Sequence, residues 1–344
     1  MIEFTTDHLE ELVVARGLLL PRPVLAGIVA ALGAGKHVML SGPPGTGKTT
    51  LAYLTAELGR SAMRCTGHLA VTASTDWTIG DTIGRYTASP EGSVFRPGVF
   101  LDAIRAGQWL VIDELNRADF DSAFGPLFTV LAGQSVVLPY KQIGHTHPMS
   151  IVPVGAASPP NTEVIRVPEP WRMIATMNEF DKDTLHRMSH ALMRRFAFVE
   201  VVAPADEVVR TLVAGPGDLV ADLLPVRRFV DLGPAPFIDA ARFAALRIQE
   251  RETTRSRVLF ESLYAYLLPQ LDALDESVKH ELLGLLEPTF DDPEAHELRR
   301  ALGPRGPSDR PVRPAEPPHL PPRTPARREN WASRMIGTYR PSGG

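Results

Sequence analysis

The segment Gly42–Thr49 constrains the fold of this chain more than any other feature. Its sequence, GPPGTGKT, matches the pattern G-x-x-x-x-G-K-S/T, in which a glycine-rich turn wraps around phosphate groups. Residues 37–41 before it predict a short buried strand, and the apolar spacing of residues 50–58 predicts a helix. A strand, this turn and a helix would aim backbone N–H groups and a helix N-terminus at one anion. The segment therefore predicts a phosphate-binding site.

Side-chain chemistry assigns roles within this segment. We expect Lys48 to reach the outer phosphates of a bound nucleotide and the Thr49 hydroxyl to bind Mg²⁺. The predicted nucleotide-contacting residues of the loop are Gly42, Pro43, Pro44, Gly45, Thr46, Gly47, Lys48, Thr49 and Thr50. The alternative, a glycine turn followed by a chance lysine, does not explain why strand, spacing and helix agree.

The composition is typical of a soluble globular protein, with 44% hydrophobic and 22% charged residues among 344. No apolar run approaches the ~20 residues that span a bilayer, and the N-terminus lacks the pattern of a secretory signal. We therefore expect a cytoplasmic protein. The single cysteine, Cys65, excludes an internal disulfide and a cysteine-cluster zinc site. We expect it to be a small residue buried in a strand, with a reactive thiol as the alternative.

Short apolar runs alternate with helical stretches between residues 37 and 203. This alternation is typical of an α/β fold, a parallel sheet with helices on both faces. Residues 134–170 interrupt it with a segment rich in Pro, Gly and Val, where we predict a β-hairpin insertion. Residues 1–36 predict an N-terminal helical segment. The predicted strands of the sheet are 37–41, 61–65, 109–113, 171–177 and 196–202.

The chain becomes mainly helical after the predicted sheet. Residues 204–302 predict a small helical domain, with its clearest helices at 240–250, 259–274 and 276–286. Residues 303–344 are dense in Pro and Arg and cannot bury a core of their own, so we predict a disordered tail there. The last apolar piece of that tail, Trp331–Tyr339, could dock on a partner or on the same chain.

Two carboxylates end the predicted strand 109–113. Asp113 would complete the Mg²⁺ shell beside Thr49, usually through water. Glu114 would act as general base on the attacking water. Neighbouring residues at a strand end point in different directions, which separates the two roles. A strand that merely ends in acidic residues is the simpler alternative, but the phosphate-binding loop favours the catalytic interpretation.

Polar residues also follow two later segments. Asn178 ends an apolar run, and a parallel α/β sheet holds its ligand at the carboxyl ends of its strands. We therefore expect Asn178 near the γ-phosphate, orienting the lytic water, although an isolated Asn is more often a cap or turn residue. Arg194 and Arg195 end a helix predicted to start near Thr184. They could cap that helix, or one could be an arginine finger for a nucleotide on a neighbouring subunit.

These motifs, taken in chain order, resemble those of AAA+ ATPases. Three runs are similar to the dynein-related and McrB-like branch, close to MoxR-type ATPases: DELNRA at 113–118, ATMN at 175–178 and ALMRRF at 191–196. The predicted insertion at 134–170 suits that branch. The resemblance implies an AAA+ nucleotide-binding core, 37–203, followed by a helical lid, with ATP and Mg²⁺ as ligands.

The resemblance also implies roles for single positions. Lys48 and Thr49 match the Walker A motif, Asp113 and Glu114 match Walker B, and Asn178 matches sensor 1.

Further positions correspond to the subunit interface and the lid. Arg194 and Arg195 match the arginine-finger position, while Asn116 and Arg117 match residues near the subunit interface. The candidate for the sensor 2 arginine of the lid is Arg257, with Arg255 close behind. Neither has the small residue–Pro–Arg context expected there.

Such proteins form head-to-tail rings, most often hexamers, in which ATP hydrolysis moves the lid and the hairpin loops. A MoxR-like chaperone would remodel or activate a protein partner, often one with a von Willebrand factor A domain. A McrB-like motor would drive a separately encoded nuclease on DNA. The net charge of −4 and the short segment before Gly42 favour the protein client and leave DNA contact open. A third possibility, a switch that barely hydrolyses ATP, would not need Glu114.

The predicted insertion contains His145 and His147. Two histidines one residue apart could bind a metal, but neither a cysteine nor a third histidine lies close in sequence. A polar loop tip is the better interpretation.

Overall fold

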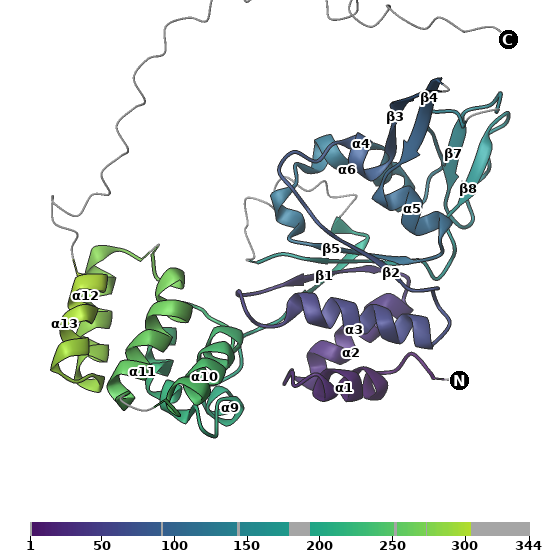
Figure 1. Cartoon of the computed structure of the whole chain (residues 1–344). Coiled ribbons are helices and arrows are strands. Elements are labelled where there is room, and N and C mark those ends of the chain that lie inside the picture. The colour runs from purple at the N-terminus through teal and green to yellow at the C-terminus, as the bar shows by residue number, and fades with distance from the viewer. Residues whose placement is uncertain are drawn as a thin grey trace, which may run out of the picture.

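The computed structural model describes residues 2–303, except for 91, 143–144, 179–192, 251–252 and 273. The first part of the chain forms a five-stranded sheet with helices on both faces, and the part after it is helical (Figure 1). The predicted fold class, a parallel α/β sheet followed by a helical region, is confirmed. The predicted tail, from residue 304 on, lies outside the described residues.

The central sheet is parallel throughout. Its strands lie in the order β10-β1-β9-β5-β2, and each neighbouring pair runs in the same direction. The carboxyl ends of β1, β9 and β5 therefore meet side by side at one edge, which is where such sheets bind ligands. The strands are β1 (His37–Ser41), β2 (His68–Thr72), β5 (Trp109–Asp113), β9 (Met173–Thr176) and β10 (Phe196–Glu200).

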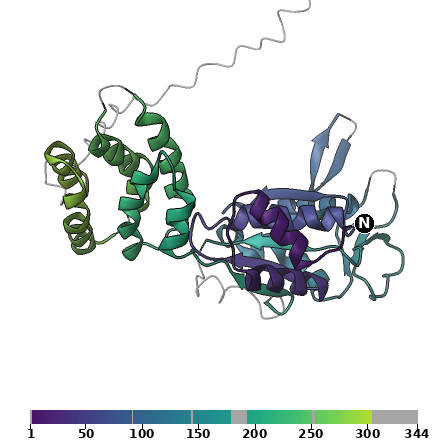
Figure 2. The same ribbon diagram turned by 90° about the horizontal axis from the view of Figure 1, so that it is seen from below.

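The central strands are buried on both faces, because their side chains alternate between two hydrophobic cores. Val38 and Val111 belong to one core, whereas Met39 and Ile112 belong to the other. Figure 2 shows the purple helices α1 to α3 lying across one face. The helices of that face are α1 (Thr6–Ala15), α2 (Arg22–Gly33) and α3 (Lys48–Ser61); those beyond the opposite face are α4 (Ile79–Thr82), α5 (Val99–Arg105) and α6 (Phe120–Leu131).

β2 starts at His68, seven residues later than the start of the strand predicted at 61–65. That segment is instead the end of α3 and the turn after it. Met63 has a φ of 56°, its N–H bonds the Arg60 carbonyl, and the Arg64 N–H bonds the Gly59 carbonyl. These bonds satisfy the last carbonyls of the helix and stop it. Cys65 consequently lies half-buried between the helix and β2, and the prediction that it sits in a strand was wrong.

Two small sheets stand outside the central one. The strands β3 (Gly84–Ser89) and β4 (Gly92–Pro97) pair antiparallel, a hairpin that the sequence patterns did not predict. In the segment 134–170, β7 (Met149–Val152) pairs antiparallel with β6 (Val136–Val137) and parallel with β8 (Glu163–Arg166). This segment therefore carries a third strand in addition to the expected hairpin.

One of the two histidines of that segment contacts an acidic residue. His145 Nδ1 lies against the carboxylate of Glu163. Within the described ranges, no three His, Cys, Asp or Glu side chains are grouped as metal ligands.

The helical region has a hydrophobic core of its own, which includes Val226, Phe237, Leu259 and Leu298. No helix among the described residues is both long and apolar enough to span a bilayer. The region consists of α9 (Asp206–Leu212), a 3₁₀ helix (Asp218–Arg228), α10 (Ala235–Arg247), α11 (Arg255–Ser262), a π-helical turn (Leu263–Leu267), a 3₁₀ turn (Leu268–Gln270), α12 (Glu276–Leu286), a 3₁₀ turn (Glu287–Thr289) and α13 (Asp292–Leu302).

Two backbone hydrogen bonds connect this region to the glycine-rich loop. The Gly233 N–H bonds the Pro44 carbonyl at 2.9 Å, and the Ala235 N–H bonds the Gly45 carbonyl at 3.2 Å. The start of α10 is thereby held directly against the loop.

Candidate nucleotide-binding site

The glycine-rich loop joins the end of β1 to the start of α3 and depends on its glycines. Gly42, Gly45 and Gly47 have φ values of 142°, 75° and 88°, which other residues rarely adopt. A Cβ atom on Gly42 would lie 2.3 Å from the Val201 carbonyl oxygen, and one on Gly47 would lie 2.2 Å from Leu18. The chain can therefore form this concave turn, ending at a helix N-terminus, only with these residues.

Lys48 is held inside the turn. Its Nζ donates to the carbonyls of Gly42 at 2.8 Å and Pro43 at 2.7 Å, and only 5% of the residue is exposed. Burial lowers the pKa of this ammonium group, while Asp113 and Glu114 act in the opposite direction. The lysine charge is thus fixed at the centre of the predicted phosphate site.

Thr49 and Asp113 meet across the loop. The Thr49 hydroxyl lies 2.8 Å from Asp113 Oδ1, and the Thr176 hydroxyl donates to the same oxygen. Hydroxyl and carboxylate oxygens are the hard ligands that Mg²⁺ takes, with waters and phosphate oxygens completing its shell. The donor set therefore fits Mg²⁺ held by Thr49 and Asp113, where the ion would neutralise phosphate charge.

Glu114 is fixed by both its backbone and its carboxylate. Its φ is 51°, an unusual value for a residue with a side chain, and its N–H donates to Thr176 Oγ1 at 3.0 Å. Carboxylate Oε1 accepts from Asn178 Nδ2 at 3.0 Å, and Oε2 accepts from Arg117 Nη1 at 2.7 Å. The structure thus brings Glu114 and Asn178 together from the ends of neighbouring strands.

Thr176 was not among the residues that the sequence indicated. It hydrogen-bonds both Asp113 and the backbone of Glu114, so it positions the two carboxylates relative to each other. The sequence could have indicated Thr176 through its position two residues before Asn178. Alternate residues of an extended chain point to the same side, so the two side chains were expected to face the same site.

A family model for AAA domains of the dynein-related subfamily matches residues 37–196. That range contains the glycine-rich loop, both strand-end carboxylates and Asn178, the groups that the fold gathers at one edge. Residues 37–196 are an AAA domain. Its assignment to the dynein-related branch of AAA+ ATPases agrees with the resemblance drawn from the motifs.

Three curated proteins are similar to the chain over different lengths. The uncharacterized protein YojN of Bacillus subtilis (strain 168) is 26% identical over 280 residues, 80% of each chain. The EcoKMcrB subunit of a type IV methyl-directed restriction enzyme from Escherichia coli (strain K12) is 26% identical over 193 residues. That match covers 54% of this chain and 39% of the relative. Midasin of Dictyostelium discoideum is 35% identical over 97 residues, 27% of this chain but 2% of midasin. The similarities to EcoKMcrB and midasin fit the dynein-related, McrB-like branch.

The two arginines at the end of the AAA domain are exposed but differ in their contacts. Arg195 donates through Nη2 to the Ala132 carbonyl at 2.6 Å. The Arg194 guanidinium has no hydrogen bond or ion pair to another described residue, although its backbone carbonyl accepts from Lys36. The helix predicted near Thr184 falls mainly on residues that the structure does not describe.

Asn116 and Arg117 follow Glu114 in a 3₁₀ turn, Leu115–Arg117. Arg117 is exposed and contacts Glu114. Asn116 Oδ1 is buried and has no hydrogen-bond partner among the residues described. A buried acceptor of this kind is uncommon in folded proteins.

A cavity of about 480 Å³ adjoins the glycine-rich loop. It lies between the loop, the segment that connects α1 to α2, and α10, and its lining includes Leu18, Thr50, Ile238 and Arg242. Sequence patterns had indicated the lining residues Gly45, Thr46, Gly47 and Thr50, but not Leu18, Ile238 and Arg242, which come from elements far away along the chain.

Arg257 lies on α11 and does not line this cavity. It pairs with Glu261 at 3.1 Å and with Glu297 at 2.7 Å. Arg255 pairs with Asp222. The structure therefore does not bring either predicted lid arginine to the loop.

Proposed function

We propose that this chain binds ATP with Mg²⁺ and hydrolyses it to ADP and phosphate. The observation that carries the proposal is the meeting of two pairs at one sheet edge. Thr49 contacts Asp113 at 2.8 Å, and Asn178 contacts Glu114 at 3.0 Å. One pair supplies oxygen ligands for Mg²⁺, and the other supplies a carboxylate base with a neighbouring amide. Both lie beside an anion-binding turn.

In this proposal each group acts on a different part of the nucleotide. The N–H groups of the Gly42–Thr49 loop and the Lys48 ammonium hold the phosphates. Asn178 orients the attacking water, and Glu114 takes its proton. The carboxylate oxygen that Arg117 holds must be released first, because an oxygen in an ion pair is a poorer proton acceptor.

The cavity beside the loop is our candidate site for the base and ribose. Leu18 and Ile238 offer apolar contacts, and Arg242 is the arginine of α10 in its lining. We propose that residues 204–302 act as a lid over this cavity. Arg242 replaces Arg257 as the candidate lid arginine, because the α10 backbone is hydrogen-bonded to the loop through Ala235.

We further propose that the site is completed by a neighbouring subunit in a head-to-tail ring, most simply a hexamer. Arg194 is the candidate finger because its exposed guanidinium has no partner among the described residues. Arg195 is less suited because it is held by the Ala132 carbonyl. A guanidinium offered to the transferred phosphate in related systems raises the rate by ~10³–10⁵.

The proposed biological role is MoxR-like, the ATP-driven remodelling or activation of a protein partner, with a von Willebrand factor A protein as one candidate. The net charge of −4 supports a protein client over duplex DNA. The second candidate role is a McrB-like motor for a nuclease, which the similarity to a restriction enzyme subunit favours.

ATP turnover measured over a range of protein concentrations tests the proposal. We expect the rate per subunit to rise steeply with concentration, because the finger comes from a neighbour. Lys48→Ala should abolish ATP binding, whereas Lys36→Ala, a lysine outside the loop, should leave it intact. A rate per subunit that does not change with concentration would contradict the shared site. Stimulation by duplex DNA would favour the nuclease-linked role.

A further inference from the structure

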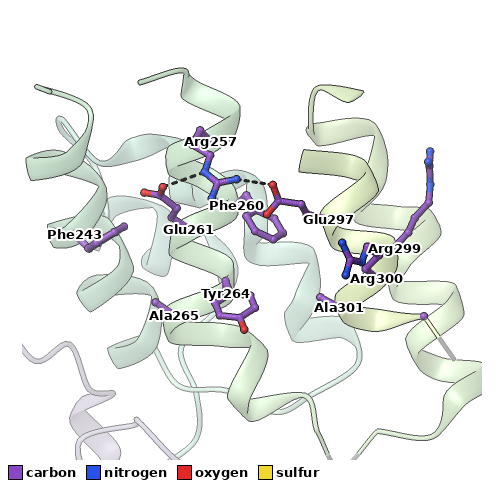
Figure 3. Close-up of a pocket in the computed structure, with 11 residues that line it drawn as sticks. Phe243, Arg257, Phe260, Glu261, Tyr264, Ala265, Glu297, Arg299, Arg300 and Ala301 are labelled. Carbon is purple, nitrogen blue, oxygen red and sulfur yellow. Dashed lines mark hydrogen bonds and ion pairs between the residues drawn. The ribbon is translucent and has the colours of Figure 1, made fainter. Parts of the chain in front are cut away.

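A second cleft, of about 1030 Å³, lies in the helical region between α10, α11 and α13 (Figure 3). It shares no lining residue with the cavity beside the glycine-rich loop. The ATPase proposal assigns it no role. Gly303, the residue that follows α13, lies in its wall.

The floor of this cleft is aromatic. Phe260 of α11 and Tyr264 of the next turn have ring centroids 6.0 Å apart and planes tilted by 34°, and the Arg257 guanidinium lies 5.6 Å from the centre of the Phe260 ring. The π-helical turn Leu263–Leu267 includes Tyr264 and leaves 59% of it exposed. Such turns are rare and are frequent at functional sites. Phe243 of α10 adds a third ring to the lining.

The polar groups of the cleft are mainly hydrogen-bond donors. Arg257 is bridged between Glu261 and Glu297, as Figure 3 shows. The guanidinium of Arg300 and the hydroxyl of Tyr264, in contrast, have no hydrogen bond or ion pair within the described part of the chain. The cleft therefore offers aromatic faces and unused donors to an occupant.

We propose that this cleft binds the proline-rich segment that follows it, residues 304–328 of the same chain. This segment contains five Pro-x-x-Pro pairs: 304/307, 311/314, 314/317, 318/321 and 322/325. A polyproline II strand presents proline rings and solvated carbonyl oxygens, and its prolines have no N–H group to satisfy. Aromatic-lined grooves with donors are the sites that recognise such strands.

The geometry of the chain favours this occupant. The segment starts at the residue after Gly303, so it begins in the wall of the cleft. A polyproline II strand rises about 3.1 Å per residue. Arg257 and Tyr264 are seven residues apart on a helix that rises about 1.5 Å per residue, roughly 10 Å in all, so a few residues would cover the aromatic floor.

Because the segment is covalently connected to the helical region, even weak binding would keep the cleft occupied. A short connection gives the segment an effective concentration in the mM range. A strand that is already extended loses less entropy on docking than a flexible one. Net charge does not select the occupant, because the lining contains three arginines and two glutamates. Stacking on Phe260 and Tyr264 and donation to carbonyls must therefore supply the affinity.

A labelled peptide of residues 304–328 tests the proposal by fluorescence anisotropy. It is titrated with the full chain and with a chain that ends at Gly303, which retains all three hydrophobic cores. We expect at least tenfold tighter binding to the shortened chain, because the intact segment competes for the cleft. Tyr264→Ala should weaken this binding at least tenfold. Leu246→Ala, which changes a 72%-exposed side chain of α10 outside the cleft, should not.

Other outcomes would overturn the proposal. Equal affinity for both chains, or no binding to either, would show that the segment does not occupy the cleft. Unchanged binding to Tyr264→Ala would place it elsewhere on the surface. A chain that ends at residue 328 separates the two parts of the tail. If it binds the peptide as tightly as the chain ending at Gly303, then Trp331–Tyr339 is the true competitor.

Discussion

Arg117 holds the carboxylate of Glu114, with Nη1 2.7 Å from Oε2. Asn178 holds the other carboxylate oxygen at 3.0 Å. The candidate general base is therefore tied at both oxygens, and Arg117 is the exposed partner of the two. A neighbouring subunit that attracts Arg117 would leave Glu114 with its Asn178 contact and one free oxygen.

Removing that ion pair should release the base. We expect Arg117→Ala to raise the ATP turnover of dilute protein about two- to fivefold with an unchanged KM, since an exposed ion pair contributes up to ~1 kcal/mol. Arg117→Lys, which retains a cation, should stay near the wild-type rate. Steady-state kinetics at low protein concentration make this measurement. A loss of turnover in dilute Arg117→Ala would mean that Arg117 assists the reaction directly.

The Thr49 hydroxyl should matter for Mg²⁺ rather than for the nucleotide alone. We expect Thr49→Val to remove most of the tightening that Mg²⁺ gives to ATP binding, on the order of tenfold, because one oxygen ligand is lost. Calorimetry with and without EDTA measures this difference. The control is Thr55→Val, which removes another α3 hydroxyl, one bonded to the Leu51 carbonyl. An equal effect of both variants would point to damage to the helix.

The two terminal arginines of the domain should differ in mixed assemblies. We expect Arg194→Ala to lose at least 10³-fold in turnover, because it is our finger, and Arg195→Ala to lose much less. Adding Lys48→Ala subunits, which cannot bind ATP but carry an intact Arg194, should restore activity to Arg194→Ala. ATP hydrolysis as a function of mixing ratio reports this rescue. If mixing restores nothing, the arginine does not act across a subunit boundary.

His37 should make the AAA domain sensitive to acid. It is buried, its Nδ1 accepts the Met173 N–H at 3.0 Å, and burial lowers its pKa to about 3. Below pH ~6.5 the unfolded chain binds a proton at this histidine, whereas the folded chain does not. The free energy of unfolding therefore decreases as the pH is lowered from about 6.5 to about 3. From pH 7 to pH 5 this contribution is about 2 kcal/mol.

Urea unfolding at both pH values measures that contribution. His37→Asn can still accept the Met173 N–H. We expect its free energy of unfolding to decrease by about 2 kcal/mol less than that of wild type when the pH is lowered from 7 to 5. His68→Asn provides the control, because that histidine is only half-buried on β2. An unchanged pH dependence in His37→Asn would assign the acid sensitivity to other groups.

Local sequence patterns predicted the parts of the site that depend on local backbone. The Gly42–Thr49 turn requires glycine at positive φ, Asp113 is the last residue of β5, and Asn178 lies two residues after β9, so each is visible in a short window of the sequence. That Glu114 meets Asn178 followed from parallel strands sharing one edge.

Features that depend on distant contacts could not be predicted in that way. The strand predicted at 61–65 was placed too early in the chain. The start of β2 is determined by the turn at Met63 that ends α3 and by the pairing of His68 with Trp109. Arg257 was chosen for its charge on a lid helix. Only the packing of the helical region determines that it meets Glu261 and Glu297 instead of the loop.

The central claim, that this AAA domain hydrolyses ATP with Glu114 as base, is tested most directly by comparing wild type with Glu114→Gln. The amide keeps the size of the side chain but cannot accept the proton of the water. With Mg²⁺ and a concentration that supports assembly, we predict that Glu114→Gln binds ATP as tightly as wild type and turns over at least a hundredfold more slowly. Equal turnover by the two proteins would contradict the account.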